Sequence, residues 1–242
     1  MSRDPASNPT SIRCREDLIR ALSAPPYWTV VDHRDDPGYT RSLLDALKSG
    51  DEGGSDKISY TEISVQPGLD ADRGLVTRLS RTSAAMPPHT DSSYSGAPHS
   101  LLAFDMVETD EEGGVSILVD ANRLLERLDE ATARLLALPI FPFGSRRFPI
   151  LAGARHDVRV RYYRAQIDKS IGEGLPLPAN AVEALERLDE MLADESLQER
   201  VRLQGGQVLF IANNRVLHGR TGLAEGSRRL MHRYRMRIPE LA

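Results

Sequence analysis

Residues 87–94 of the chain, PPHTDSSY, place a histidine and an aspartate two positions apart. In an extended segment, residues i and i+2 point to the same side, so His89 and Asp91 could present an imidazole and a carboxylate to one metal ion. The pattern alone is weak evidence, because the chain has only six histidines and repeats the pattern at His33 and Asp35. A metal site at His89 and Asp91 therefore needs a further ligand.

His218 is the best candidate for that ligand. It ends a short apolar segment in RVLHGRTG, where Gly219 and Gly222 leave space for another group to approach the backbone. Two histidines and one carboxylate on one face of an octahedral ion form the facial triad of non-haem Fe(II) oxygenases, which keeps coordination positions open. A structural zinc site would instead require four protein ligands. The three residues therefore predict a catalytic iron site.

An anion that chelates such an iron needs a cationic anchor, and the segment RRLMHRYRMRI near the C-terminus offers two arginines. Arg229 and Arg233 are four residues apart, so on a strand they share one face and lie about 13 Å from each other. The alternate residues of this segment, such as His232, lie on the other face. The planar guanidinium group can grip a carboxylate with two parallel hydrogen bonds, which predicts a carboxylate-binding strand beside the metal.

Four motifs follow one another along the chain: PPHTDSSY, EEGGVSILVDA, NNRVLHGRTG and RRLMHR. In this order and spacing they resemble the Fe(II)- and 2-oxoglutarate-dependent oxygenases of the taurine dioxygenase type, which include clavaminate synthase and γ-butyrobetaine hydroxylase. The resemblance runs from about His89 to the C-terminus and is weak before it. It implies a double-stranded β-helix, a cupin-like jelly roll whose two sheets pinch a metal pocket at one end, with helices outside.

The resemblance also implies roles for individual residues. His89, Asp91 and His218 would bind Fe(II), and Arg229 would bind the distal carboxylate of 2-oxoglutarate. Ser116 matches the hydroxyl residue that shares this carboxylate, although the family usually has threonine there. The hydroxyl group is kept, and only a methyl group is lost.

The implied reaction uses O2 and the oxidative decarboxylation of 2-oxoglutarate to succinate and CO2 to oxidise an unactivated C–H bond of a second substrate. We expect hydroxylation, with desaturation or cyclisation as the alternative. Asp91 argues against halogenation, because related halogenases carry a small residue in place of this carboxylate. Arg233 matches a position that meets an anionic substrate group in several members, and Tyr94 is a pocket candidate beside the metal motif. A pocket with Arg233 favours a small substrate that bears a carboxylate or resembles an amino acid.

The composition limits the other functions. With 242 residues, 27% of them charged and 40% hydrophobic, the chain has the balance of a soluble globular protein, and we expect no membrane association. The net charge of −4 and the lack of interleaved basic and aromatic residues argue against a nucleic-acid partner. Cys14 is the only cysteine, and the first thirty residues contain no apolar signal core, which predicts a cytoplasmic location. A metal-dependent sensor of 2-oxoglutarate without turnover remains the alternative to an enzyme.

The predicted fold class is mainly β with flanking helices. We expect residues 1–10 to form a loose N-terminus and residues 11–242 a single oxygenase domain. Arg159 and Arg161 are interpreted as solvated residues on the outer face of a strand, and Asn213 as one of two turn-forming residues. Strands are predicted at residues 27–33, 57–65, 100–107, 115–120, 157–167, 205–212, 215–221 and 228–238, and helices at 11–24, 39–50, 124–136 and 181–193.

Overall fold

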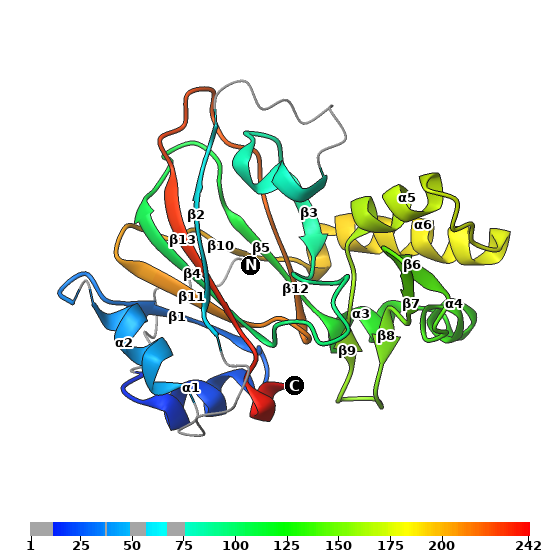
Figure 1. Cartoon of the computed structure of the whole chain (residues 1–242), viewed down its shortest axis with the longest axis horizontal. Coiled ribbons are helices and arrows are strands. Elements are labelled where there is room, and N and C mark those ends of the chain that lie inside the picture. The colour runs from blue at the N-terminus through cyan, green and yellow to red at the C-terminus, as the bar shows by residue number, and fades with distance from the viewer. Residues whose placement is uncertain (1–11, 37, 49–56, 67–75) are drawn as a thin grey trace.

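Two antiparallel sheets form the centre of the protein (Figure 1). The computed structural model describes residues 12–36, 38–48, 57–66 and 76–242, so the predicted loose N-terminus lies outside the described residues. One sheet has the strand order β1-β11-β4-β13-β2, and the other has the order β10-β5-β12-β3. Their bounds are β1 Trp28–Asp32, β2 Ser59–Ser64, β3 Met86–His89, β4 Leu101–Glu108, β5 Ser116–Asp120, β10 Glu199–Val201, β11 Gln207–Ala212, β12 Val216–Arg220 and β13 Leu230–Met236.

The inner strands β11 and β4 of the five-stranded sheet carry buried side chains on both faces because both faces are covered. Phe210 and Leu209 are neighbours on β11, so their side chains point to opposite faces, yet both are fully buried. On the outer face the sheet packs against helices α1 (Arg15–Leu22) and α2 (Tyr39–Ala46), which contribute the buried Leu18 and Leu44 to the same hydrophobic cluster (Figure 1). The inner face is turned toward the second sheet.

A second hydrophobic cluster lies beside the four-stranded sheet and is built mainly from helices (Figure 1). Asp120 and Asp129 cap the first two of these helices by accepting hydrogen bonds from the backbone N–H groups of Asn122 and Thr132. The remaining elements are α3 Ala121–Arg127, α4 Glu130–Leu136, β6 Phe141–Phe143, β7 Arg146–Phe148, β8 Leu151–Ala152, β9 Arg159–Val160, α5 Arg164–Gly172 and α6 Ala179–Ala193, with short 3-10 helices at Val76–Arg81, Glu195–Leu197 and Pro239–Leu241.

The strand predicted at residues 157–167 is mostly wrong, because only Arg159–Val160 form a strand, β9. Val158, Val160 and Tyr162 are buried in alternation, as a strand requires, but helix α5 begins at Arg164. The interpretation of Arg161 as a solvated residue is wrong. Its guanidinium donates to two carbonyl groups of the loop after residue 91, at 2.9 and 2.6 Å, and lies 3.8 Å from the centre of the Phe148 ring.

The predicted fold class is confirmed, because the strands form a jelly roll of two antiparallel sheets with helices outside. The other predicted strands correspond to observed strands, and the leucines of residues 124–136 form two short helices instead of one. A single domain over residues 11–242 stays a prediction. No helix among the described residues is long and apolar enough to span a bilayer.

Candidate metal centre and cofactor pocket

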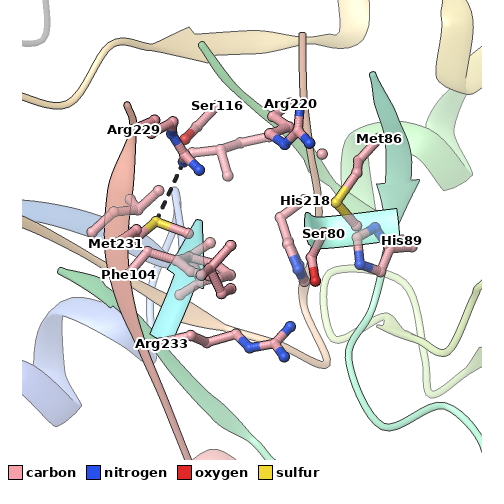
Figure 2. A pocket seen from close by; sticks show the side chains of 15 residues that line it. Ser80, Met86, His89, Phe104, Ser116, His218, Arg220, Arg229, Met231 and Arg233 are labelled. Carbon is pink, nitrogen blue, oxygen red and sulfur yellow. Dashed lines mark hydrogen bonds between the residues drawn. The ribbon is translucent and has the colours of Figure 1, made fainter. Parts of the chain in front are cut away.

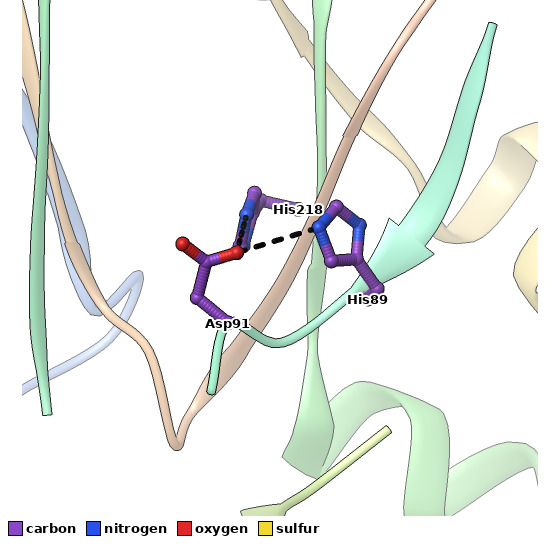
Figure 3. Close-up of side chains that lie close together, drawn as sticks. All are labelled: His89, Asp91 and His218. Atoms are coloured by element: carbon purple, nitrogen blue, oxygen red, sulfur yellow. Dashed lines mark ion pairs between the residues drawn. The ribbon is translucent and has the colours of Figure 1, made fainter. Parts of the chain in front are cut away.

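Three buried side chains meet between β3 and β12: His89 from the end of β3, Asp91 from the turn that follows it, and His218 from β12 (Figure 3). The Nε2 atoms of His89 and His218 lie 3.6 and 3.8 Å from the same carboxylate oxygen, Oδ1 of Asp91. These separations are too long for hydrogen bonds. Ligand atoms about 2.1 Å from a shared ion lie about 3 to 3.5 Å apart, so the three atoms have nearly the spacing of ligands around one metal ion.

The pairing of β3 with β12 brings the two histidines together. His89 and His218 are direct partners in the antiparallel ladder, and their ring centres lie 4.4 Å apart. Gly219 makes this approach possible, because a Cβ atom at this position would lie 2.4 Å from the carbonyl oxygen of Met86. The space predicted at Gly219 is therefore filled by the neighbouring strand, which carries the first histidine.

Contacts around the imidazole rings fix their orientation. Nδ1 of His89 lies 3.0 Å from the carbonyl oxygen of Pro87, so Nδ1 carries the proton and donates, and Nε2 turns its lone pair toward Asp91. The rings of Tyr163 and Phe104 pack against His89 and His218, with centres 4.8 and 5.2 Å away. Such outer contacts hold a ligand ring in place before a metal binds.

The protonation states suit metal binding. Burial, helped by the neighbouring His89, lowers the pKa of His218 to about 3, so this imidazole is neutral at neutral pH. Burial alone would raise the pKa of Asp91, but Arg233 and the two histidines outweigh it and lower the pKa well below the usual range. Divalent metals require neutral imidazoles and ionised carboxylates, so the three residues fit the Fe(II) ion that the sequence motifs predict.

Asn213 holds the loop that carries Asp91, a role that sequence reasoning missed. Its Oδ1 accepts from the backbone N–H of Asp91 at 2.8 Å, and its Nδ2 donates to the carbonyl oxygens of Asp91 and His99 at 3.0 and 2.7 Å. The side chain is only 1% exposed. The sequence marks Asn213 only as a turn residue, because its type does not show that its side chain is buried and bonded to the metal loop.

A pocket of about 490 Å³, including its open mouth, lies between the two sheets beside the metal centre (Figure 2). The predicted residues that line it are His89, Ser116, His218, Arg229 and Arg233. Asp91 lies next to these in the triad. The other lining residues are mostly apolar: Ile63, Ser80, Met86, Phe104, Leu118, Leu209, Ile211, Gly219, Arg220 and Met231.

Arg229 is a buried cation that forms no salt bridge among the described residues, although the more distant charge of Asp110 acts on it. It is 4% exposed, its Nε has no hydrogen-bond partner, and its terminal nitrogen donates to the sulfur of Met231 at 3.3 Å (Figure 2). Burial lowers its pKa to about 10, so it remains charged at neutral pH. An unpaired buried charge is costly, and an anionic ligand in the pocket would remove this cost.

The model of one protein family matches residues 49–235, which is more than three quarters of the chain: the taurine catabolism dioxygenase TauD, TfdA family. The chain belongs to the TauD/TfdA family. The predicted family and the class of dioxygenase are therefore confirmed. The four ordered motifs predicted both, whereas a single His-x-Asp pattern would not have been enough.

Two solved structures share the fold of this TauD/TfdA-family chain. A crystal structure of asparagine oxygenase aligns with a TM-score of 0.73 at 17% identity, covering 93% of this chain and 78% of that one. The non-heme iron oxygenase OrfP in complex with Fe and alpha-ketoglutaric acid aligns with a TM-score of 0.66 at 17% identity, covering 92% and 79%. At this identity the likeness shows a common fold.

A second buried arginine lines the pocket of this TauD/TfdA-family chain and was not predicted. Arg220 is 5% exposed and donates to the carbonyl oxygens of Thr82 and Thr221. Burial and the nearby Arg229 lower its pKa to about 10. Arg220 therefore ties the segment before β3 to β12, and it adds positive charge to the pocket.

The two residues predicted to meet the substrate lie in different surroundings. Arg233 lines the pocket, and its terminal nitrogen NH1 lies 3.1 Å from Oδ2 of Asp91, the carboxylate oxygen that faces away from the histidines. Tyr94 is 58% exposed and does not line the pocket. The structure thus brings Arg233, but not Tyr94, to the wall of the pocket.

Proposed function

We propose that this chain is an Fe(II)- and 2-oxoglutarate-dependent dioxygenase that hydroxylates an unactivated C–H bond of a small, carboxylate-bearing molecule, with release of succinate and CO2. The observation that carries the proposal is the buried triad of His89, Asp91 and His218 beside a pocket that contains the unpaired cation of Arg229. Membership of a dioxygenase family supports the same reaction class.

In this proposal His89, Asp91 and His218 would hold the iron, and a site with three protein ligands would leave it able to bind 2-oxoglutarate and O2. Bound iron supplies the activation of O2. Two hydrogen bonds of the protein hold the ligands in place: one from Nδ1 of His89 to Pro87, and one from the backbone N–H of Asp91 to the side-chain amide of Asn213.

Arg229 and Ser116 bind the distal carboxylate of 2-oxoglutarate in this proposal. Ser116 on β5 and Arg229, the residue before β13, both line the pocket (Figure 2). The guanidinium can grip a carboxylate bidentately, and the apolar lining excludes water from the reacting centre. With its distal carboxylate held in this way, 2-oxoglutarate would turn its keto acid end toward the triad.

The proposed substrate is a small molecule, and Arg233 and Tyr94 are its candidate contacts. One solved asparagine oxygenase structure contains 3-hydroxyasparagine and succinate, and one OrfP structure contains (3S)-hydroxy-L-Arg, which supports an amino-acid-like or carboxylate-bearing substrate here. We further propose that the protein acts in the cytoplasm on this small molecule and has no nucleic-acid partner, in keeping with its net charge of −4.

The test is an anaerobic titration of the metal-free protein with Fe(II) and then with 2-oxoglutarate. A weak visible charge-transfer band should appear only when both are present, because it reports a keto acid chelated to the iron. His232→Gln is the matched control for His218→Gln, since His232 lies on the opposite face of β13 and does not line the pocket. The band should survive His232→Gln and disappear in His218→Gln.

The same samples separate an enzyme from a sensor of 2-oxoglutarate. On admission of O2, an enzyme releases succinate and CO2, and release rises when a suitable substrate is added. A sensor would form the band and release no succinate with any substrate. Absence of the band in well-folded protein would overturn the proposed function altogether.

A further inference from the structure

A second arginine of β13 stands beside Arg233 at the metal centre. Arg235 places its terminal nitrogen NH1 3.7 Å from Oδ2 of Asp91, and its NH2 donates to Oγ of Ser59 at 3.1 Å. The side chains of Arg233 and Arg235 are only 14% and 20% exposed, and the Nε atom of each is buried without a hydrogen-bond partner. Two guanidinium groups therefore share one carboxylate oxygen.

Asp91 cannot neutralise both arginines. Its carboxylate carries one negative charge, and its other oxygen, Oδ1, faces the two histidines of the triad. When a divalent cation binds there, the charge of Asp91 is shared with that cation as well. The substrate side of the triad thus has an excess of positive charge and two buried N–H donors that lack an acceptor.

The strands next to β13 bring no acidic side chain to this face within the described residues. Directly paired residues of an antiparallel sheet point to the same side. Arg233 is paired with Thr61 of β2 and Phe104 of β4, and Arg235 is paired with Ser59 and with a leucine of β4. The positions that face the substrate are therefore hydroxyl-bearing or apolar.

The acidic residues of these two strands lie on the opposite face. Glu62 and Asp105 are both paired with His232, which alternates away from the arginines. Asp105 is also bonded to His33, with 2.9 Å between its Oδ1 and Nε2 of the histidine. Neither carboxylate is available to an ammonium group at the metal centre.

We propose that the substrate is a carboxylate without a free ammonium group, held between Arg233 and Arg235. This inference rests on the proposed function and narrows its substrate class. A free amino acid would bring an ammonium group into a site that already holds two guanidinium groups. Among the described residues, the strands beside it offer this ammonium group no carboxylate besides the iron ligand Asp91. An N-acylated amino acid, or the corresponding acid without the amino group, satisfies the arginines and avoids this repulsion.

The experiment compares matched ligands on the protein loaded anaerobically with Fe(II) and 2-oxoglutarate. The pairs are L-asparagine against N-acetyl-L-asparagine and against succinamate, which lacks the amino group, and L-arginine against N-acetyl-L-arginine. Binding is measured by calorimetry and by the change in the visible band. We expect the ligands without an ammonium group to bind at least about tenfold more tightly than their zwitterionic partners, because ammonium and guanidinium charges repel at short range.

Two variants test the arginine pair directly. Arg235→Met keeps an unbranched apolar stem and removes the guanidinium group with its charge, so the affinity for the preferred carboxylate should fall about 10- to 100-fold. Arg228→Met is the matched control, because the Arg228 side chain is 84% exposed on the same segment and pairs with Glu108. The control should leave the affinity unchanged.

Thr61→Asp tests whether the lack of an acidic side chain on this face sets the substrate preference, and it leaves both arginines in place. It introduces a carboxylate opposite Arg233, so it should shift the preference toward the zwitterionic ligands, whereas Thr61→Asn, of the same size but uncharged, should not. Equal or tighter binding of the zwitterions to the unaltered protein would overturn the inference. So would failure of every carboxylate to bind. If the band of chelated 2-oxoglutarate is present in these samples, the proposed function stands and only the substrate class is wrong.

Discussion

The chain contains the pattern His-x-Asp twice, and the structure places the two copies in different surroundings. His89 and Asp91 are both buried and face a second histidine from another strand. In the first copy, Nε2 of His33 is bonded to Asp105 at 2.9 Å, and Asp35 is exposed. The histidine of the first copy is therefore used in a hydrogen bond, and its aspartate faces solvent.

The difference lies in what each copy meets across the sheet. The copy at His89 leaves β3 where β12 lies close enough to bring His218 opposite it, and Gly219 permits that distance. The copy at His33 follows β1, an edge strand of the other sheet, and ends in a turn before α2. Whether a His-x-Asp pattern forms a metal centre therefore depends on the strand that pairs with it, and the three residues of the pattern alone do not determine it.

The sharpest way to break this comparison is to remove the aspartate from each copy. Asp91→Ala removes one ligand of the metal and the counter-charge of two arginines, so we expect iron affinity to fall more than about 100-fold and succinate release to be lost. Asp35→Ala should change neither quantity. Iron binding is measured by anaerobic titration, and full activity of Asp91→Ala would contradict the ligand assignment.

The next largest effect is expected from Arg229, with its neighbour Arg228 as the control; both residues come just before β13. Arg229→Met removes the buried cation of the pocket, and the affinity for 2-oxoglutarate should fall about 10- to 100-fold because a charge-assisted pair is lost. Arg228→Met removes a neighbouring exposed charge and should have no effect. Iron binding without 2-oxoglutarate is the internal check, and it should be the same in both variants.

A smaller effect is expected from Asn213, whose side-chain amide holds the loop that carries Asp91. Asn213→Ala removes three hydrogen bonds that hold Asp91 and His99, so iron affinity should fall about tenfold, as for other outer contacts of metal ligands. The matched control Asn214→Ala loses only a bond from Nδ2 to the carbonyl oxygen of Leu241. If both variants lose stability equally and neither loses iron affinity, Asn213 is merely structural.

Sequence reasoning found the residues whose chemistry is carried by their type, and it missed those that act through their environment. His218 and Arg229 are predicted from the ordered motifs, and both line the pocket. Arg220, Arg235 and Asn213 lack such a signal, because an arginine or asparagine becomes informative only when its burial and its partners are known. Register between strands sets these properties, and register depends on contacts far apart in the chain.

The smallest effect on the metal centre is expected at the first copy of the pattern. His33→Ala leaves the buried carboxylate of Asp105 without its bond to Nε2 and removes the stacking on Tyr39, whose ring centre lies 5.8 Å away. Loss of one partner of a buried hydrogen bond costs about 1 to 3 kcal/mol in the free energy of unfolding, which a urea titration measures. Iron and 2-oxoglutarate affinities should stay unchanged, because β4, which carries Asp105 outward, is held on both sides by β11 and β13. A fall in iron affinity equal to that of Asn213→Ala would show instead that the two copies are coupled through β4, since Phe104 of the same strand packs on His218.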